Sequence, residues 1–318
     1  MLALTASQPT RSSPANPETI ARAAQLLRDG GVVAFPTETV YGLCANAEHY
    51  EAVRRVFAIK GRPFGHPVIV HLALSAQMDE WVAEIPYAAR LLSERFWPGP
   101  LTLVLPRSKR ASDVVTGGQD TVAIRVPSDR VGHDILRRAG IGVIAPSANR
   151  FGAVSATRAE HVVADFGDAV DLIVDGGPTT VGIESTIVSL VSGEPAILRP
   201  GGITREQLEE ALRAPVRMGG TEIRVPGSMP SHYAPLARVE LFDELESAKE
   251  RVRALETSGE RVELLAPERG VEAFARELYE RLREADARSA QTIVIVAPPE
   301  GGIGTAIRDR LKRMSSRA

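Results

Sequence analysis

Apolar residues recur along the chain with two different spacings, which alternate over its first two thirds. Spacings of three and four residues predict helices at 17–31, 49–63, 87–100, 130–140 and 156–168, with the first beginning at Pro17 and the fourth capped by Ser128. Short apolar runs predict strands at 32–37, 66–72, 101–108, 121–128, 142–149, 171–177, 185–191 and 195–202. Some strands are joined by connectors too short for a helical crossover, so we expect a mixed α/β sheet.

The pattern weakens after residue 212 and then returns in a simpler form. Residues 213–236 are rich in Pro and Gly with little periodicity, which predicts a linker. Residues 237–318 repeat strand and helix three times, which predicts a small Rossmann-like, parallel α/β domain. Residues 1–16 are rich in Pro, Ser and Thr and predict a flexible N-terminal arm. The main domain is therefore expected at 17–212.

Composition narrows the class of protein. The 318 residues carry a net charge of −2, so general binding to the nucleic-acid backbone is not favoured, although a local basic pocket stays possible. The single cysteine, Cys44, excludes an intramolecular disulfide and a multi-cysteine zinc site, and it fits a cytoplasmic location. No signal peptide or membrane-spanning run is predicted.

Several predicted strands and one helix end in residues that a protein core does not favour. Thr37, Glu38 and Thr39 follow the first strand, and Arg125 lies within another. Because ligands lie at strand ends in open α/β sheets, we expect these ends to converge. A converged pocket would hold at least the cations Lys60, Arg62, Arg125 and Arg199 among hydroxyl groups. Such a site suits a polyanion such as a nucleoside triphosphate.

Each of these features also has a structural alternative. The threonines suit an edge strand, with Glu38 on the surface. Lys60 and Arg62 suit a solvated helix end, where cations complement the helix dipole. Cys44 suits a small apolar filler, and the histidines suit packed or surface positions. Arg125 has the weakest alternative, since an arginine among apolar strand residues is costly unless it is paired.

Familiar nucleotide and hydrolase motifs do not account for these residues. The sequence has no GxxxxGK[ST] loop, and Ser147 lies in APSAN instead of the GxSxG of a nucleophile elbow. The segment GGIGTAI follows a strand and opens a helix, but its spacing differs from GxGxxG. A structural glycine turn is therefore favoured there over a dinucleotide site.

Taken together, the segments resemble one family. FPTETVYGL, KGRP, HPVIVHL, FWPGPLTLVL, VAIRVP, APSAN, ESTIV and ILRPG occur in the order and spacing of the YrdC-like superfamily. The later PGSMPSHYAP and the small C-terminal domain resemble its two-domain threonylcarbamoyl-AMP synthases. The resemblance implies a twisted, open mixed sheet around a positively charged cavity. It also implies a nucleotidyltransferase that joins L-threonine, bicarbonate or CO2, and ATP into threonylcarbamoyl-AMP and releases pyrophosphate.

The resemblance also implies roles for particular residues. The expected threonine site comprises Thr39, His71, Arg125, Ala145 and Ser185. The expected ATP site comprises Lys60, Arg62, His66, Thr121, Ser147, Asn149, Ser155, Arg199 and Tyr233, with Tyr233 closing over the nucleotide. Lys60, Arg62 and Arg125 are the expected catalytic residues. Glu38, by our own inference, orients hydroxyls or the amine from behind. Mg2+ is expected to be held mainly by ATP phosphates, with no protein metal site.

The implied product serves tRNA modification through a separate threonylcarbamoyltransferase complex. Three alternatives remain at this point: an RNA-binding module, a carbamoyl-adenylate enzyme, and a paralogue that keeps the pocket without turnover. The near-neutral charge and the threonine-like set of residues weigh against the first as the main role, although weak RNA binding stays possible. The chain has no acylphosphatase or zinc-finger region, which weighs against a carbamoyl-adenylate enzyme.

Overall fold

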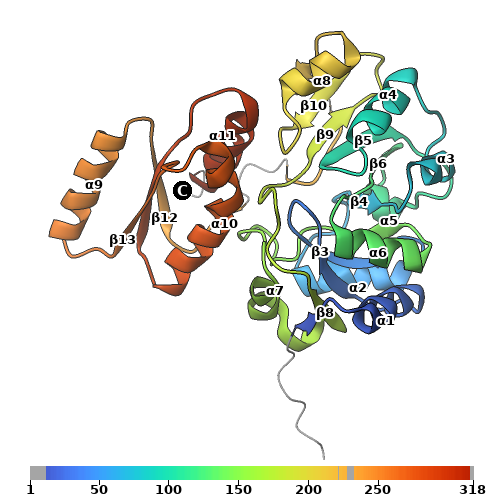
Figure 1. Cartoon of the computed structure of the whole chain (residues 1–318), viewed down its shortest axis with the longest axis horizontal. Coiled ribbons are helices and arrows are strands. Elements are labelled where there is room, and N and C mark those ends of the chain that lie inside the picture. The colour runs from blue at the N-terminus through green and yellow to red at the C-terminus, as the bar shows by residue number, and fades with distance from the viewer. Residues whose placement is uncertain (1–11, 221, 228–232, 316–318) are drawn as a thin grey trace, which may run out of the picture.

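Two α/β domains lie side by side in the computed structural model, which describes residues 12–220, 222–227 and 233–315 (Figure 1). The larger domain is drawn in blue to yellow and the smaller one in orange to red. Helices α10 (Val271–Ala287) and α11 (Gly302–Ser315) of the smaller domain face the larger domain, whereas α9 (Leu245–Thr257) lies on the far side. Residues 1–11 of the predicted arm and 221 and 228–232 of the predicted linker lie outside the described residues.

The larger domain contains short helices and strands at the predicted positions, and it also has β3, α3, α5, α8 and β11, which the sequence pattern did not predict. Its α-helices are α1 (Pro17–Arg28), α2 (Tyr50–Lys60), α3 (Met78–Trp81), α4 (Tyr87–Phe96), α5 (Asp113–Thr116), α6 (Arg130–Ala139), α7 (Ala159–Phe166) and α8 (Arg205–Leu212). Its strands are β1 (Ser13–Pro14), β2 (Val33–Pro36), β3 (Tyr41–Asn46), β4 (Ile69–His71), β5 (Leu101–Pro106), β6 (Thr121–Arg125), β7 (Val143–Ile144), β8 (Leu172–Asp175), β9 (Thr186–Ser189), β10 (Ala196–Arg199) and β11 (Arg217–Met218).

Within the described residues, these strands form one sheet in the order β1-β8-β2-β3-β7-β4-β6-β5-β9-β10-β11. The sheet contains both parallel and antiparallel pairs: β2 is antiparallel to β3, for example, whereas β4 is parallel to β6. The prediction of a mixed sheet is thereby confirmed. The β4–β6 register places His71 opposite Arg125, so two candidate site residues from different motifs become neighbours at the ends of these strands.

The end of the predicted arm is tied to the sheet. Ser13 and Pro14 pair with β8, and the Asn16 side chain accepts a hydrogen bond of 2.8 Å from the Thr19 amide. Asn16 is therefore the N-cap of α1, which begins at Pro17 as predicted. This cap and the strand pair fix the residues just before the first helix.

The smaller domain is built on three parallel strands in the order β12-β14-β13. These are β12 (Arg238–Phe242), β13 (Val262–Leu265) and β14 (Thr292–Val296). The glycine in the first turn of α11 has a steric explanation, because a Cβ at Gly304 would lie 2.2 Å from the Pro299 carbonyl oxygen. In the described part of the chain, no helix is both long and apolar enough to cross a membrane.

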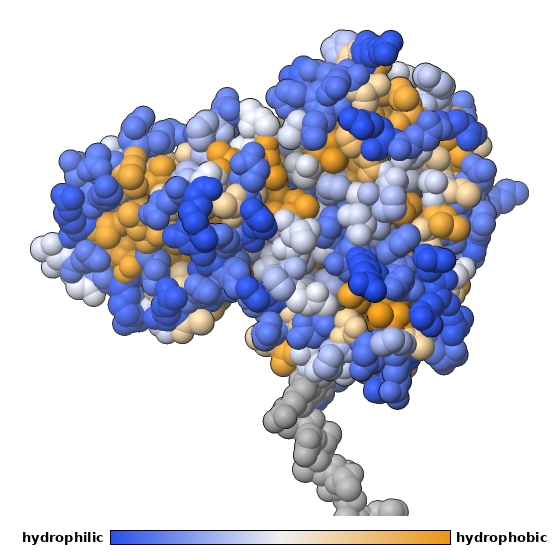
Figure 2. Space-filling view, viewed as in Figure 1, coloured by the Kyte–Doolittle hydropathy of each residue, from blue (hydrophilic) through white to orange (hydrophobic). Residues whose placement is uncertain are grey.

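A shared apolar cluster joins the two domains. Val40, Val154 and Ile183 of the larger domain pack with residues of α10 such as Phe274 and Leu278. The approach is close, since a Cβ at Gly182 would lie 2.4 Å from the Arg276 Cα, and the Gly182 φ of +82° also favours glycine. Figure 2 shows hydrophilic side chains over most of this face, with apolar ones in smaller patches on both domains.

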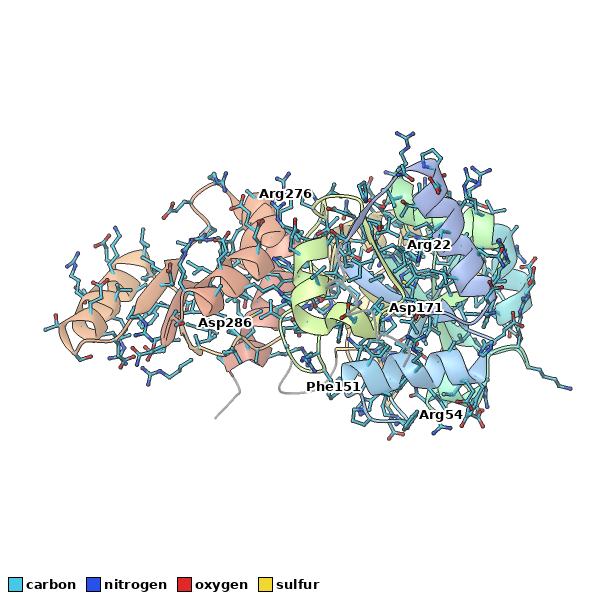
Figure 3. The ribbon with its side chains drawn as sticks, turned by 90° about the horizontal axis from the view of Figure 1, so that it is seen from below. Arg22, Arg54, Phe151, Asp171, Arg276 and Asp286 are labelled. Carbon is cyan, nitrogen blue, oxygen red and sulfur yellow. The ribbon has the colours of Figure 1, made fainter. Side chains whose placement is uncertain are left out.

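Charged groups anchor the same junction. The Asp286 carboxylate, labelled on α10 in Figure 3, accepts hydrogen bonds from the Leu236 and Ala237 amides. Arg283 forms an ion pair of 2.7 Å with Asp165 and donates to the carbonyls of Val154 and Ser155. Helix α10 is therefore bonded both to the chain leading out of the linker and to the loop that carries Ser155.

Candidate active site

A cavity of about 50 Å³ lies where the predicted strand ends meet. The segments after β2 and β7 contribute to its wall, together with Ile69 and His71 of β4, Arg125 at the end of β6 and Arg199 at the end of β10. The linker closes one side. The lining residues are Thr37, Thr39, Val40, Gly42, Arg62, Ile69, His71, Arg125, Ala145, Pro146, Ser147, Glu184, Ser185, Arg199, Pro226, Gly227 and Tyr233.

The threonines after β2 build a buried turn. The Thr37 hydroxyl donates to the Val40 carbonyl at 2.7 Å and lies 2.8 Å from the Thr39 hydroxyl. Strand β2 lies inside the sheet between β8 and β3, so the edge-strand alternative is wrong. Both hydroxyls are nearly inaccessible to solvent, at 2% and 1% exposure. The turn delivers the Thr39 hydroxyl to the cavity while its backbone groups stay bonded.

Arg125 is held from three directions. Its Nη1 donates to the Thr39 hydroxyl at 3.0 Å, and its Nε donates to the Gly99 carbonyl at 3.2 Å. Its Nη2 lies 2.8 Å from Oε1 of Glu38, which is 5% exposed, so the surface alternative for Glu38 is wrong. This contact is an ion pair without hydrogen-bond alignment, and among the described residues neither atom has a hydrogen-bond partner. Arg125 Nη2 therefore keeps hydrogen-bonding capacity for a ligand.

The other carboxylate oxygen of Glu38 explains why Ser128 does not cap α6. The Ser128 amide donates to Glu38 Oε2 at 3.1 Å. The N-cap is the next residue, Asp129, whose carboxylate accepts from the Gly132 amide at 2.9 Å. The prediction of a Ser128 cap was wrong because both residues can cap a helix and only the tertiary contact with Glu38 separates them.

His71 is a neutral imidazole beside this pair. Burial and the neighbouring Arg125 cation lower its pKa from 6.5 to about 3. Its Nδ1 lies 3.4 Å from the Ile69 carbonyl oxygen, which can only accept, so this contact favours the proton on Nδ1. Nε2 is then left as a hydrogen-bond acceptor at neutral pH.

Arg199 connects the opposite wall to the linker. Its guanidinium donates to the Ser185 carbonyl and, at 3.0 Å, to the Ser185 hydroxyl. Its Nη1 donates to the Pro226 carbonyl at 3.0 Å. The Ser185 hydroxyl also lies 2.8 Å from that of Thr102 on β5, a partner that the sequence did not suggest. These contacts fix Ser185, which belongs to the expected threonine site, next to Arg199 of the expected ATP site.

Lys60 and Arg62 are both buried, so the solvated helix-end alternative is wrong. Arg62 lines the cavity and donates to the Pro67 carbonyl at 2.8 Å, and burial lowers its pKa to about 10. Lys60 does not line the cavity. Its ammonium donates to the carbonyls of Ser147 and Asn149, both at 2.5 Å, and so it holds the APSAN loop in place. Burial, followed by the Arg62 charge, lowers the Lys60 pKa well below its usual value.

Four further residues of the expected ATP site lie outside the cavity lining. Asn149 donates to the carbonyls of Arg150 and Ala153, and Ser155 donates to Glu184. His66 contacts the Phe151 ring edge on, at 5.7 Å between centroids, and Thr121 begins β6. Cys44, by contrast, is a buried free thiol whose pKa is raised by burial, as its filler alternative requires.

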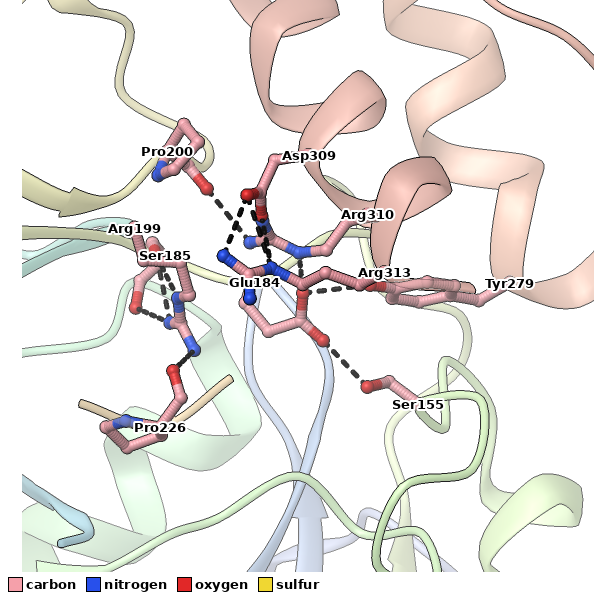
Figure 4. Close-up of polar contacts among 10 residues, drawn as sticks. All are labelled: Ser155, Glu184, Ser185, Arg199, Pro200, Pro226, Tyr279, Asp309, Arg310 and Arg313. Atoms are coloured by element: carbon pink, nitrogen blue, oxygen red, sulfur yellow. Dashed lines mark hydrogen bonds and ion pairs between the residues drawn. The ribbon is translucent and has the colours of Figure 1, made fainter. Parts of the chain in front are cut away.

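A buried cluster behind the cavity brings in the smaller domain (Figure 4). Glu184 lines the cavity, and its Oε2 accepts from Arg310 Nε and from the Tyr279 hydroxyl, both at 2.9 Å. Burial opposes ionisation of Glu184, but Arg310, Arg199 and the hydrogen bonds prevail and lower its pKa to about 2. Sequence reasoning missed Tyr279 and Arg310. For Arg310 a signal was available in the sequence: it lies three and four residues from the apolar Ile307 and Ala306, which places it on the apolar face of its helix.

Comparison with known proteins agrees with this geometry. The model of the Sua5/YciO/YrdC family, described as "Telomere recombination", matches residues 25–201, and "Threonylcarbamoyl-AMP synthase, C-terminal domain" matches residues 203–316. The chain belongs to the threonylcarbamoyl-AMP synthase family. The protein of that name from Bacillus subtilis (strain 168) is 40% identical over 94% of this chain and 93% of its own length.

Archaeal relatives give the same result for sequence and structure. The threonylcarbamoyl-AMP synthase of Pyrococcus abyssi is 38% identical over 92% of this chain and 93% of its own length. The structure titled "Crystal structure of P. abyssi Sua5 complexed with L-threonine" superposes with a TM-score of 0.89, covering 93% of this chain and 94% of that one at 37% identity. The predicted family and α/β fold are therefore confirmed.

Among the described residues, no group of three or more acidic, histidine or cysteine side chains is arranged to hold a metal ion. The one carboxylate of the cavity wall, Glu184, is already bonded to Arg310, Tyr279 and Ser155. The protein side chains of this site therefore suit an organic anion better than a bare cation.

Proposed function

We propose that this chain is a nucleotidyltransferase that makes threonylcarbamoyl-AMP and pyrophosphate from L-threonine, bicarbonate or CO2, and ATP. The observation that carries the proposal is one cavity that joins two sets of residues. The cavity is lined both by Thr39, His71, Arg125 and Ser185, which are expected to bind threonine, and by Arg62, Ser147 and Arg199, which are expected to bind the nucleotide. The names of the relatives and the bound threonine in the similar structure support the same assignment.

The threonine side matches a small zwitterion with a hydroxyl. Arg125 Nη2 is buried and available to a carboxylate, and its guanidinium is already held by Thr39 and Gly99. Neutral His71 offers an acceptor to an ammonium or hydroxyl group. Ser185 and Thr39 add hydroxyls within the same wall, and the Ala145 backbone lies beside them. Because the arginine is fixed in advance, binding costs little further ordering.

The nucleotide side places two arginines near the phosphates. Arg62 and Arg199 line the cavity, and Lys60 with Asn149 supports Ser147 from behind. Pockets for ligands of nucleotide size usually enclose about 300–1,000 Å³. The present space is about 50 Å³, so we infer that a nucleotide displaces at least part of the wall formed by Pro226, Gly227 and Tyr233. Mg2+ is expected to arrive with ATP, held mainly by phosphate oxygens.

The chemistry follows from positioning and charge. The neutral threonine amine takes up CO2 to give a carbamate, whose oxygen forms a bond to the α-phosphorus while the bond to pyrophosphate breaks. Holding the carbamate in line with that bond supplies much of the rate. The guanidinium groups stabilise charge on the phosphoryl oxygens and on leaving pyrophosphate. Glu184, with a pKa of about 2, is a poor base, which assigns it to support and not to proton transfer.

Downstream events are part of the same proposal. We expect the product to pass to a separate tRNA threonylcarbamoyltransferase complex and the protein to act in the cytoplasm. Direct binding of RNA, if present, is expected to be weak and to fall steeply with salt concentration.

The test is release of pyrophosphate from ATP-Mg2+ with threonine and bicarbonate, omitting each substrate in turn. We expect release only with all three, and a loss of at least about a hundredfold in Arg125→Ala, because the carboxylate anchor is removed. Arg22→Ala is the matched control, since Arg22 is an exposed arginine on α1 (Figure 3) and does not line the cavity. Release that ignores threonine, or equal losses in both variants, would contradict the proposal.

A further inference from the structure

The last helix of the smaller domain reaches the back of the cavity through one arginine. Arg310 on α11 is fully buried, although arginine is rarely buried without partners. Its Nε donates to Glu184 at 2.9 Å, its Nη2 to the Pro200 carbonyl at 2.9 Å, and its Nη1 to its neighbour Asp309 at 2.6 Å. Figure 4 shows these bonds between the helix and the loops of the larger domain.

Each partner in the larger domain is next to a residue of the cavity. Glu184 precedes Ser185, and Pro200 follows Arg199. The second oxygen of Glu184 accepts from the Ser155 hydroxyl at 2.7 Å. A single guanidinium therefore holds the two backbone segments that carry Ser185 and Arg199, and it fixes Ser155 through one carboxylate.

The linker aromatic residue rests on the same group. The Arg310 guanidinium lies 5.1 Å from the Tyr233 ring centroid, and the Tyr233 and Tyr279 rings stack at 6.0 Å. The Tyr279 hydroxyl, in turn, donates to Glu184 at 2.9 Å. Arg310 and Tyr279 of the smaller domain thus contact both Tyr233, in the cavity wall, and Glu184.

We propose that Arg310 is a positioning residue for the nucleotide side of the cavity, acting through Glu184 and the Pro200 carbonyl, with Tyr279 in an auxiliary role. This inference rests on the proposed function of the cavity. Arg310 does not line the cavity, so its bonds to Glu184 and Pro200 are the route by which it can act on the site. Arg125 and His71 of the threonine side have no contact with it, because they are held by Glu38, Thr39, Gly99 and Ile69. Of the expected threonine-binding residues, only Ser185 lies in a segment that Arg310 holds, so the loss of Arg310 is expected to weaken ATP binding more than threonine binding.

The test compares Arg310→Met, Arg310→Lys and Tyr279→Phe in the full-length chain. We expect Arg310→Met to raise the KM for ATP on the order of tenfold or more, because charge-assisted bonds to buried groups are lost. The KM for threonine should change by less than about threefold. Arg310→Lys should recover only part of the loss, since an ammonium lacks the planar fork that serves Glu184 and Pro200 together. Tyr279→Phe, which removes one hydroxyl, should give a rise of a few fold.

Two further variants separate positioning from general stability. Arg308→Ala is the matched control, because Arg308 lies on the same helix but, within the described part of the chain, its side chain bonds only to Asp243 and Pro298 of its own domain. Its KM for ATP should equal that of the wild type. In Glu184→Gln/Arg310→Met, the unpaired buried carboxylate is gone, so we expect part of the ATP affinity to return. Urea unfolding of both variants shows whether the ATP affinity returns by more than the stability does, which a role in folding alone would not produce.

Calorimetric binding of ATP, measured without turnover, keeps this inference separate from the proposed function. Absence of product in the wild type would overturn the proposed function, while the ATP affinities of the variants would still report on Arg310. Should Arg310→Met fail to fold, Arg310→Lys and Tyr279→Phe carry the test. Unchanged ATP affinity in these variants, or an equal loss in Arg308→Ala, would overturn the positioning role.

Discussion

Two buried ion pairs flank the cavity, and they are arranged in opposite senses. In the pair Glu38–Arg125, both partners belong to the larger domain, and the cation lines the cavity while the carboxylate stands behind it. In the pair Glu184–Arg310, the carboxylate lines the cavity and the cation stands behind it on the smaller domain. Both arginines are 3% exposed or less. The same type of ion pair thus presents its cation to the cavity in one case and its carboxylate in the other.

The difference indicates what each pair does. A forward-facing guanidinium offers charge to an anionic ligand, and the carboxylate behind it sets its direction. A forward-facing carboxylate held by an arginine keeps its charge but has little capacity left for a ligand, since Arg310, Tyr279 and Ser155 already occupy its oxygens. The first pair therefore belongs to binding and the second to support, so equivalent mutations should have unequal effects.

The largest effect is expected when Arg125, the cation that faces the cavity, is replaced by a cation of different shape. Arg125→Lys keeps the charge, but an ammonium cannot bond Thr39, Gly99 and a carboxylate in the fork geometry of guanidinium. We expect kcat/KM for threonine to fall by about a hundredfold. Steady-state kinetics at saturating ATP measures this. A value near that of the wild type would show that charge alone suffices at this position.

A smaller effect separates the two carboxylates. Glu38→Gln should raise the KM for threonine about tenfold, because an ion pair with Arg125 is replaced by a neutral contact, and should leave the KM for ATP within about twofold. Glu184→Gln should do the reverse, raising the KM for ATP severalfold. Both substitutions keep the size of the side chain, so a general effect on folding should be similar in the two variants. If both changed the same KM, the proposed division between binding and support would be wrong.

A third comparison concerns stability instead of binding, and it sets His71 beside Arg125 against His161 beside Arg283 of the smaller domain. Burial lowers the pKa of His71 to about 3, with Arg125 as the next cause, and lowers that of His161 to about 4, with Arg283 of the smaller domain as the next cause. Both pKa values lie below the value of 6.5 expected for the unfolded chain, which therefore binds more protons on acidification. The free energy of unfolding should fall as pH decreases from about 7 toward 4.

For fully buried His71 the loss between pH 7 and pH 5 should be about 2 kcal/mol, and for the partly exposed His161 it should be less. Urea unfolding at both pH values measures the sum, and His161→Gln should remove the smaller share. A variant whose stability depends on pH as strongly as that of the wild type would exclude His161 as a contributor.

The sequence was sufficient to predict the fold class and the meeting of strand ends. Polar residues after buried runs, such as Thr39 and Ser147, carry that information locally, since burial without a partner is costly. The parallel order of the small domain also followed from its simple repeat of strand and helix. These features depend on short segments and on rules that relate them to the edge of a sheet.

The partners of these residues could not be predicted in the same way. Glu38 and Arg125 are separated by 87 positions, and Glu184 and Arg310 by 126. The sequence of either segment alone does not indicate its partner, because ion pairing depends on where the fold places the two side chains. Lys60 illustrates the same limit, since its place as the first residue of KGRP predicted a nucleotide contact, whereas the structure bonds its ammonium to two carbonyls.

The close packing at Gly182 has a consequence for how such chains can be recombined. No side chain fits there, because α10 passes within contact of the backbone, and Glu184 lies two positions further along. A chimaera that joins this larger domain to the smaller domain of another chain must keep three features together: the surface of α10, an arginine at the place of Arg310 and a tyrosine at the place of Tyr279. The two domains are therefore expected to be inherited together, as one unit of evolutionary exchange.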